Sequence, residues 1–320
     1  MPMIRIDASV RGRQRTATRG LSRVAVPLAG VVAVTLGLAC SALAEPAAQP
    51  SVAFDRGRLF RIDRPGLAPS YVYGTLHSND PRVVALPPAV VSALAASRAA
   101  AFESLLLEAD VATFLAAAHY EDGRRLGDHI DPVTLERVRA TLGLDGNDRL
   151  LIERAKPWAV LLMLAQSRNG GTASLDGILQ AEARARRMAV LSLELPDEQV
   201  ASLDAIPLAS QVALLRWALD TQHARPAELE AATRAWLAGD LAGLRRLSLA
   251  PGQRDPRLAV HLRALLKHLI TDRNVVMAHR LHLPLARGRV FVAVGALHLH
   301  GREGLLALIR EQGYRVTRVI

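Results

Sequence analysis

The chain has 320 residues, a formal charge of +10 and one cysteine, Cys40, and half of its residues are hydrophobic. This length can bury a substantial core, either as one large domain or as one domain with an inserted helical part. Nearly all of the positive charge is arginine, and no basic stripe is interleaved with aromatic residues, so the composition argues against a nucleic-acid-binding protein.

Residues 1–44 have the pattern of a secretory signal peptide. Residues 1–23 hold six arginines and one acid, and an apolar run from Val24 to Ala44 closes on Ala42-Leu43-Ala44. A basic region, a short apolar run and a small-x-small exit are what a signal peptidase recognises. We therefore expect an exported protein, periplasmic or extracellular, that meets the membrane only through this segment. An uncleaved anchor is the alternative, because the apolar run approaches the length of a membrane span.

Cys40 allows a third reading of the same segment. Gly37-Leu38-Ala39-Cys40 loosely resembles a lipoprotein box, which would place a lipid anchor on the cysteine. Cleavage after Ala44 would instead remove the only cysteine, and with it any disulfide, cysteine nucleophile or thiolate metal site. It would also leave 34 basic and 29 acidic residues, so the charge would be +5.

The remaining chain is expected to be a short linker, residues 45–57, followed by one α/β domain over residues 58–320. Short runs with alternating, aromatic or wholly apolar residues predict strands. Their ranges are Leu59–Asp63, Ser70–Tyr73, Ala99–Phe102, Ala189–Leu193, Arg289–Val294 and Gly313–Val319.

Helices are expected between these strands, where apolar residues recur at three- and four-residue spacing. The predicted ranges are 88–97, 132–142, 149–166, 174–187 and 302–312, with a further helical region over 207–282 that is punctuated by Pro226, Gly239 and Pro251. Strands at both ends and helices between them predict a central mixed sheet with flanking helices and a large helical insertion at about 111–187.

Two of the predicted strands end in the same motif. Gly74-Thr75-Leu76-His77 follows the second strand, and Gly295-Ala296-Leu297-His298 follows the fifth. A glycine there lets the backbone leave the strand sharply and lets another group approach closely. Ligands of open α/β sheets collect outside the carboxyl ends of the strands. If the two strands are neighbours, His77 and His298 face one crevice, where they could ligate a metal or transfer a proton.

A metal site of this kind needs a carboxylate beside the histidines. Glu103 is the first candidate because it ends a predicted buried strand, and Glu108 lies close enough behind it to be confused with it. Glu194 also closes a predicted strand, although it could equally cap the helix that follows. His300 could be a further ligand, but its position in the loop favours an ordinary polar residue.

Arg273 and Asn274 lie in the helix that leads toward the second motif. An arginine could clamp an anionic or carbonyl oxygen, and an asparagine could orient a water or a substrate. The other common catalytic signatures are missing from the sequence: it has no G-x-S-x-G elbow, no Walker A loop, no G-x-G-x-x-G and no H-E-x-x-H.

These segments together resemble the TraB/PrgY/GumN family over roughly residues 55–320. The resemblance rests on Gly74-Thr75-Leu76-His77, on Arg273-Asn274 and on the block from Val294 to Gly301, continued by Gly304-Leu305-Leu306 and Gly313-Tyr314-Arg315-Val316. Leu175-Asp176 and Leu193-Glu194, followed by Glu198-Gln199, also match. Leu297 replaces a commoner small residue, and His300 stands where the family often has proline.

The resemblance implies a fold similar to the erythromycin esterase and ChaN-like group. It also links the chain to the Tiki metalloproteases, whose two G-x-x-H motifs and a glutamate carry activity. Carried over by position, this makes His77, His298 and Glu103 the ligands of a divalent metal such as Mn, Co or Zn, with Glu103, Arg273 and Asn274 as catalytic residues. The expected function is metal-dependent hydrolysis of a peptide or other small extracytoplasmic substrate.

Two other functions fit the same crevice. It could belong to a non-catalytic binding protein for a peptide, a haem-like ligand or a polysaccharide-derived ligand. It could also belong to an acid/base enzyme that works without metal.

Overall fold

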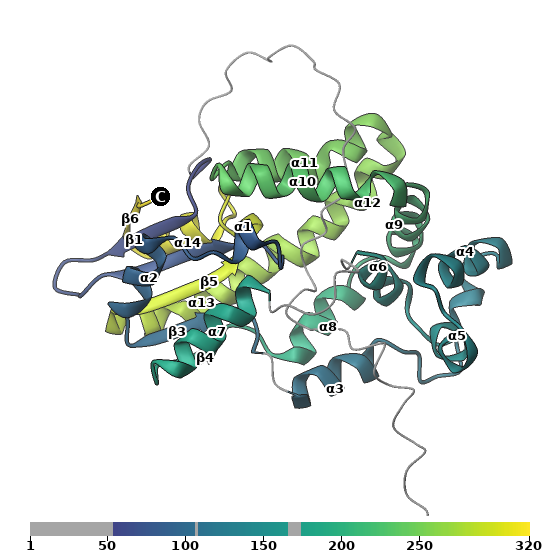
Figure 1. Ribbon diagram of the computed structural model, residues 1–320, viewed down its shortest axis with the longest axis horizontal. Coiled ribbons are helices and arrows are strands. Elements are labelled where there is room, and N and C mark those ends of the chain that lie inside the picture. Colours follow the sequence, from purple (N-terminus) through teal and green to yellow (C-terminus); the bar gives the residue numbers. More distant parts are fainter. Residues whose placement is uncertain (1–53, 106–107, 166–173) are drawn as a thin grey trace, which may run out of the picture.

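The computed structural model describes residues 54–105, 108–165 and 174–320. The predicted signal peptide, Cys40 and residues 45–53 of the linker lie outside this part of the chain, and so does the side chain of Glu108. The centre of the fold is a six-stranded sheet with the strand order β4-β3-β5-β2-β1-β6 (Figure 1). The strands are β1 (Leu59–Asp63), β2 (Ser70–Thr75), β3 (Ala99–Phe102), β4 (Ala189–Ser192), β5 (Val290–Gly295) and β6 (Arg315–Arg318).

The sheet is mixed, and its parallel part carries the carboxyl ends that matter here. β4, β3, β5 and β2 run parallel, whereas β1 is antiparallel to both β2 and β6. β5 lies between β3 and β2 and is buried along its whole length, which accounts for its unbroken apolar sequence up to Gly295. The predicted α/β class with a mixed sheet is therefore confirmed.

The two strands that end in the G-x-x-H motifs are neighbours in the sheet, which is the condition for His77 and His298 to face one crevice. β2 pairs with β5 in parallel, with Gly74 opposite Val294 and Thr75 opposite Gly295. A β-carbon on Gly74 would lie 2.7 Å from the Leu299 side chain and 3.2 Å from the Ala296 backbone. Glycine at this position thus allows the loop after β5 to pack directly on β2.

Helices cover the sheet and form a second body beside it (Figure 1). The α-helices are α1 (Pro81–Val84), α2 (Pro88–Ala95), α3 (Glu108–Ala117), α4 (Pro132–Leu142), α5 (Gly146–Glu153), α6 (Pro157–Ala165), α7 (Leu175–Ala185), α8 (Pro196–Asp204), α9 (Leu208–Asp220), α10 (Arg225–Leu237), α11 (Leu241–Arg254), α12 (Pro256–Leu266), α13 (Asp272–Arg287) and α14 (Leu305–Glu311). Short 3₁₀ turns are η3 (Leu126–Asp128), η4 (Gln222–Ala224) and η6 (Ala296–His298), and η5 (Lys267–Thr271) is a π-helix that joins α12 to α13.

At two prolines the helices differ from the sequence prediction. The single helix expected over 149–166 is two helices, α5 and α6, because Pro157 has no backbone N–H to continue a helix but is well suited to begin one. Pro251, expected as a break, lies inside the last turn of α11.

The buried residues form two separate apolar cores. One contains the sheet together with residues of α2, α7, α10, α11, α13 and α14. The other contains residues of α3, α4, α5, α6, α8, α9, α12 and η5, and we call this part the helical lobe. α7 was expected within the helical insertion, but its residues Leu175, Leu179 and Ala183 belong to the sheet core.

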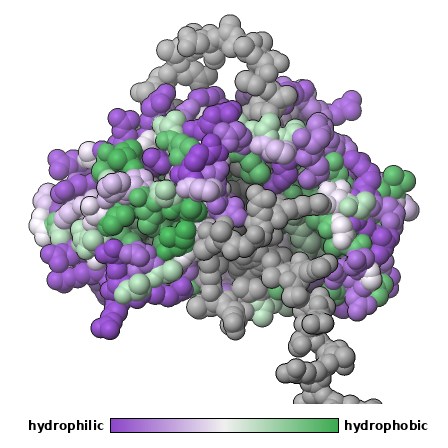
Figure 2. All heavy atoms as spheres, in the orientation of Figure 1, coloured by the Kyte–Doolittle hydropathy of each residue, from purple (hydrophilic) through white to green (hydrophobic). Residues whose placement is uncertain are grey.

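The surface is mainly polar on the face seen in Figure 2. Apolar side chains gather there over α2, where Val91 is 38% exposed. Among the described helices, none is both long and apolar enough to cross a membrane.

Candidate metal and catalytic site

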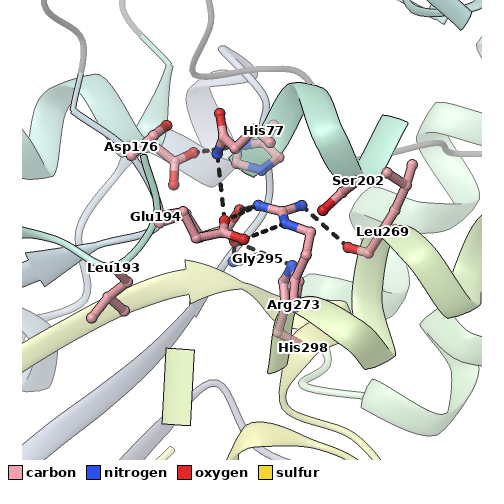
Figure 3. A network of polar contacts seen from close by, with 12 residues as sticks. His77, Asp176, Leu193, Glu194, Ser202, Leu269, Arg273, Gly295 and His298 are labelled. Atoms are coloured by element: carbon pink, nitrogen blue, oxygen red, sulfur yellow. Dashed lines mark hydrogen bonds and ion pairs between the residues drawn. The ribbon is translucent and has the colours of Figure 1, made fainter. Parts of the chain in front are cut away.

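His77 leaves the carboxyl end of β2 and is held by an aspartate from α7. Its Nδ1 lies 2.7 Å from Asp176 Oδ2 (Figure 3). The other oxygen of the same carboxylate accepts a hydrogen bond from the Thr75 hydroxyl at 2.7 Å. A carboxylate only accepts hydrogen bonds, so the imidazole proton sits on Nδ1. In the neutral ring, the Nε2 lone pair of His77 is therefore turned away from Asp176 and is free for another group.

His298 is the last residue of η6 after β5, and an asparagine holds it. Asn274 Nδ2 donates to the backbone carbonyl of Glu303 at 2.8 Å, which turns Asn274 Oδ1 toward His298 Nδ1, also at 2.8 Å. Because Oδ1 accepts, this ring also carries its proton on Nδ1 when it is neutral. The His298 side chain is 2% exposed, and its Nε2 has no hydrogen-bond partner among the described residues.

Glu103 follows β3 and places its carboxylate between the ends of the neighbouring strands. Glu103 Oε1 accepts the backbone N–H of Gly295 and lies 3.6 Å from His298 Nε2. A β-carbon on Gly295 would be 3.2 Å from this oxygen and 3.7 Å from His77 Nε2. The two histidines and Glu103 thus meet around Gly295, which has no side chain to fill the space.

Arg273 and Asn274 are buried, and their hydrogen bonds go to protein groups. Arg273 donates to Glu194 through Nε (2.7 Å) and through Nη2, to Glu103 Oε2 through Nη2 (3.1 Å) and to the carbonyl of Leu269 through Nη1 (3.2 Å). These contacts give both residues a direct role in holding Glu103 and His298. The substrate-directed roles expected from the sequence stay predictions.

The charges at the site do not balance if both histidines are neutral. Of the described side chains that meet there, Glu103, Glu194 and Asp176 are acids and Arg273 is the base, which leaves two negative charges in excess. Burial of unbalanced charge is costly, so such a site favours a positive guest or a proton.

Burial and the neighbouring charges shift the pKa values of Glu103, His77 and His298 in different directions. Burial alone would raise the pKa of Glu103, but His298, Arg273 and His77 lower it to about 2. Burial also opposes protonation of His77, yet Asp176 beside it raises the pKa of His77 to about 9. His298 has no such partner on its Nδ1, and burial lowers its pKa to about 4. At pH 7 the Glu103 carboxylate is therefore ionised, His298 is neutral and His77 is protonated, so the His77 proton offsets one of the two excess negative charges.

The structure brings together most of the residues that the sequence singled out, but not all. His300 turns elsewhere, with its Nε2 3.0 Å from Asp55, and so does not join His77 and His298. Asp176 and Thr75 were not predicted as site residues, although Leu175-Asp176 had matched the family pattern. Glu194, for which the sequence allows a strand-end acid or a helix cap, pairs with Arg273. Across the described ranges, no three or more His, Cys, Asp or Glu side chains form a preformed metal cluster.

Comparison with known proteins gives a family match that covers these residues. A sequence profile of the TraB/PrgY/gumN family matches residues 59–318. The match includes both G-x-x-H motifs and every side chain of the site described above. No curated protein sequence and no solved structure gave a match.

Proposed function

Because the chain belongs to the TraB/PrgY/gumN family, we propose that it is a metal-dependent hydrolase whose paired histidines, His77 and His298, hold a divalent metal ion together with Glu103. The bond that it cleaves is a peptide bond or a similar one, by resemblance to the Tiki metalloproteases. It acts outside the cytoplasm, a location that the signal-like residues 1–44 support.

One observation carries this proposal: among the described residues the buried His298 Nε2 has no hydrogen-bond donor, and it faces the Glu103 carboxylate. His298 Nε2 and Glu103 Oε1 are 3.6 Å apart, and both present lone pairs. A buried acceptor without a partner costs roughly 1–3 kcal/mol, and a cation between the two atoms would remove that cost. His77 Nε2 would complete the set, since it lies near the same point as Glu103 Oε1, the position of a β-carbon on Gly295.

The surroundings of these atoms fit a divalent metal. Metal-bound histidines commonly donate their second ring nitrogen to a carboxylate or a carbonyl oxygen, which fixes the tautomer, and Asp176 and Asn274 accept from the Nδ1 atoms in this way. Two imidazoles and one carboxylate suit Zn, Mn or Co, and they leave a coordination position for water or substrate. A divalent ion that displaces the His77 proton would balance the two excess negative charges that remain when both histidines are neutral.

The residues around the metal would then have separate roles in the reaction. A bound divalent metal lowers the pKa of a water molecule and polarises a scissile carbonyl group. Asp176 and Asn274 keep the two imidazoles oriented, and Arg273 holds Glu103 from the side away from the histidines. The Glu103 carboxylate, which is ionised near neutrality, would accept a proton from that water molecule.

The test is hydrolysis of a defined peptide mixture by the purified protein, with Mn²⁺, Co²⁺ or Zn²⁺ added and products identified by mass spectrometry. We expect cleavage that a chelator abolishes, that readdition of metal restores, and that is absent from His77→Ala and His298→Ala. Metal binding without turnover would favour a non-catalytic binding protein for a peptide, haem-like or polysaccharide-derived ligand. Cleavage that survives the chelator would favour an acid/base enzyme without metal.

A further inference from the structure

Glu194 is a buried acid that has no role in the hydrolysis proposed above. It lies two residues after the end of β4 and is 2% exposed. Its carboxylate accepts from Arg273 through both oxygens, and Gln199 Nε2 lies 3.4 Å from Oε2. It has no contact with either histidine that would make it a ligand beside them.

Arg273 hydrogen-bonds to two glutamates, Glu194 and Glu103, but it does not bind them equally. Figure 3 shows the Arg273 guanidinium beside Glu194. Arg273 holds Glu194 in a two-bond fork and Glu103 by one bond of 3.1 Å. Forked guanidinium–carboxylate pairs are the stronger kind, because two parallel charged hydrogen bonds form at once. The main counter-charge of Arg273 is therefore Glu194, and Glu103 keeps Oε1 directed at His298.

The electrostatic effect of removing Glu194 follows from this arrangement. The Arg273 guanidinium, 2% exposed, would then have Glu103 as its remaining acidic partner. An arginine that neutralises a ligating carboxylate in a buried site also repels a divalent cation, and burial strengthens both effects. The excess of two negative charges at the site would fall to one.

We propose that Glu194 is a positioning residue that holds and neutralises Arg273, so that Glu103 keeps both its charge and an oxygen for the metal. This inference rests on the proposed function, since it concerns the same metal. It assigns Glu194 an effect on metal affinity that is exerted through Arg273 and not by contact with the ion.

The first test compares two glutamate variants by titration with Mn²⁺, Co²⁺ and Zn²⁺. Glu194→Gln keeps the size of the side chain and removes its charge, so metal affinity should fall by roughly 10- to 100-fold, the usual effect of losing an outer-shell partner. The control is Glu198→Gln, in which the lost ion pair is the partly exposed one with Arg280. It should bind metal as the wild type does.

A double variant separates this charge effect from simple damage to the fold. Glu194→Gln combined with Arg273→Met removes both charges, so Glu103 is no longer neutralised, and metal affinity should rise above that of Glu194→Gln alone. If Glu194 were merely structural, the second substitution would bring no recovery. Should the single variant not fold, the double variant decides alone, and loss of its metal binding would overturn the proposal.

The outcomes distinguish this inference from the function on which it rests. If the wild type binds no metal, both fall. If the wild type and Glu198→Gln bind metal and Glu194→Gln binds it equally well, the proposed metal site stands and the role of Glu194 is wrong.

Discussion

The two histidines have similar motifs but unlike partners. His77 donates to a carboxylate, Asp176, whereas His298 donates to the neutral amide of Asn274. The sequence predicts that the histidines meet, because each follows a glycine at the end of a strand. It does not predict their partners, since Asp176 is 99 residues from His77 and Asn274 is 24 residues from His298. Such pairings depend on which helices cover the strand ends.

These partners predict how the stability of the metal-free protein depends on pH on the acid side. The pKa of His298 is about 4 in the folded protein, whereas an ordinary histidine, as in the unfolded chain, has a pKa of 6.5. Between these values the unfolded chain binds more protons, so the free energy of unfolding should decline as pH falls from 6.5 to 4. Denaturant unfolding in chelator, followed by circular dichroism, measures this. His298→Gln should flatten the decline, and an unchanged slope would show that His298 does not cause it.

Above pH 6.5 the stability should depend on His77, and here it should decline as pH rises. The pKa of His77 is raised from 6.5 to about 9, so the folded metal-free protein retains a proton that the unfolded chain has lost. Stability should therefore decline as pH rises from 6.5 to 9, which places its maximum near pH 6.5. Asp176→Asn should weaken this decline in the same unfolding measurement. A wild-type protein that gains stability across this range would contradict the described contact.

Gly295 predicts a substitution that affects binding more than folding. Its φ of −54° suits any residue, so alanine there is not strained in its backbone. The added methyl group would instead sit 3.2 Å from Glu103 Oε1 and 3.7 Å from His77 Nε2, in the space where the metal is proposed. Metal affinity should fall at least tenfold, as measured by titration, while overpacking lowers stability by about 1–3 kcal/mol.

The control for this substitution is Gly127→Ala in the helical lobe. A β-carbon there meets one atom, Leu135 Cδ2, at an ordinary contact distance of 3.8 Å. It should leave metal binding unchanged. Equal affinities for the Gly295 and Gly127 variants would mean that the space around Gly295 is not used by a metal.

At the scale of elements, the sheet could be predicted from sequence better than the helices. All six strands lie within two residues of their predicted ends, because short apolar runs bounded by turn residues leave little choice. The helices between them are harder to delimit. α5 and α6 form one continuous periodic pattern, and only the position of Pro157 at the start of a new first turn separates them.

The sequence also could not show to which core a helix belongs. α7 has the same amphipathic pattern as its neighbours in the chain, yet it packs on β3 and β4 and brings Asp176 to His77. The π-helix η5 is likewise invisible in the sequence. It precedes Arg273 and supplies the Leu269 carbonyl that accepts from this arginine.

The start of α7 gives a prediction at this scale. Ser174 caps the helix by accepting from the Gly177 N–H at 3.3 Å, and Asp176 lies two residues further on. Ser174→Ala should cost about 1 kcal/mol of stability, as cap losses do. Because the first turn of α7 would fray, metal affinity should fall as well. Thermal unfolding and metal titration of the same samples measure the two effects.

A cap in the helical lobe provides the comparison. Asp131 caps α4 by accepting from the Thr134 N–H at 2.9 Å, far from the histidines along the chain. Asp131→Ala should lower stability by a similar amount and leave metal affinity unchanged. If both cap variants lose metal equally, the effect comes from general destabilisation and not from the position of Asp176.

At the scale of the whole molecule, the site belongs to the sheet core but is supported from the lobe side. His77, Glu103, Glu194 and His298 follow the parallel strands β2, β3, β4 and β5 in turn. Arg273 reaches them from the helix that continues η5 and α12, and residues of both belong to the helical lobe core. Because the parallel strands end on the same side of the sheet, residues that are spread over more than 220 positions of the chain lie together there.

The most direct test of the central claim is metal content. Protein purified in parallel as wild type, His77→Ala and His298→Ala should be loaded with Mn²⁺, Co²⁺ or Zn²⁺, desalted and analysed by mass spectrometry, with His300→Ala as the control. We predict about one divalent ion per chain in the wild type and in His300→Ala, and loss of that ion from the other two variants. Equal metal content in all four proteins, or none above background in the wild type, would contradict the proposed site.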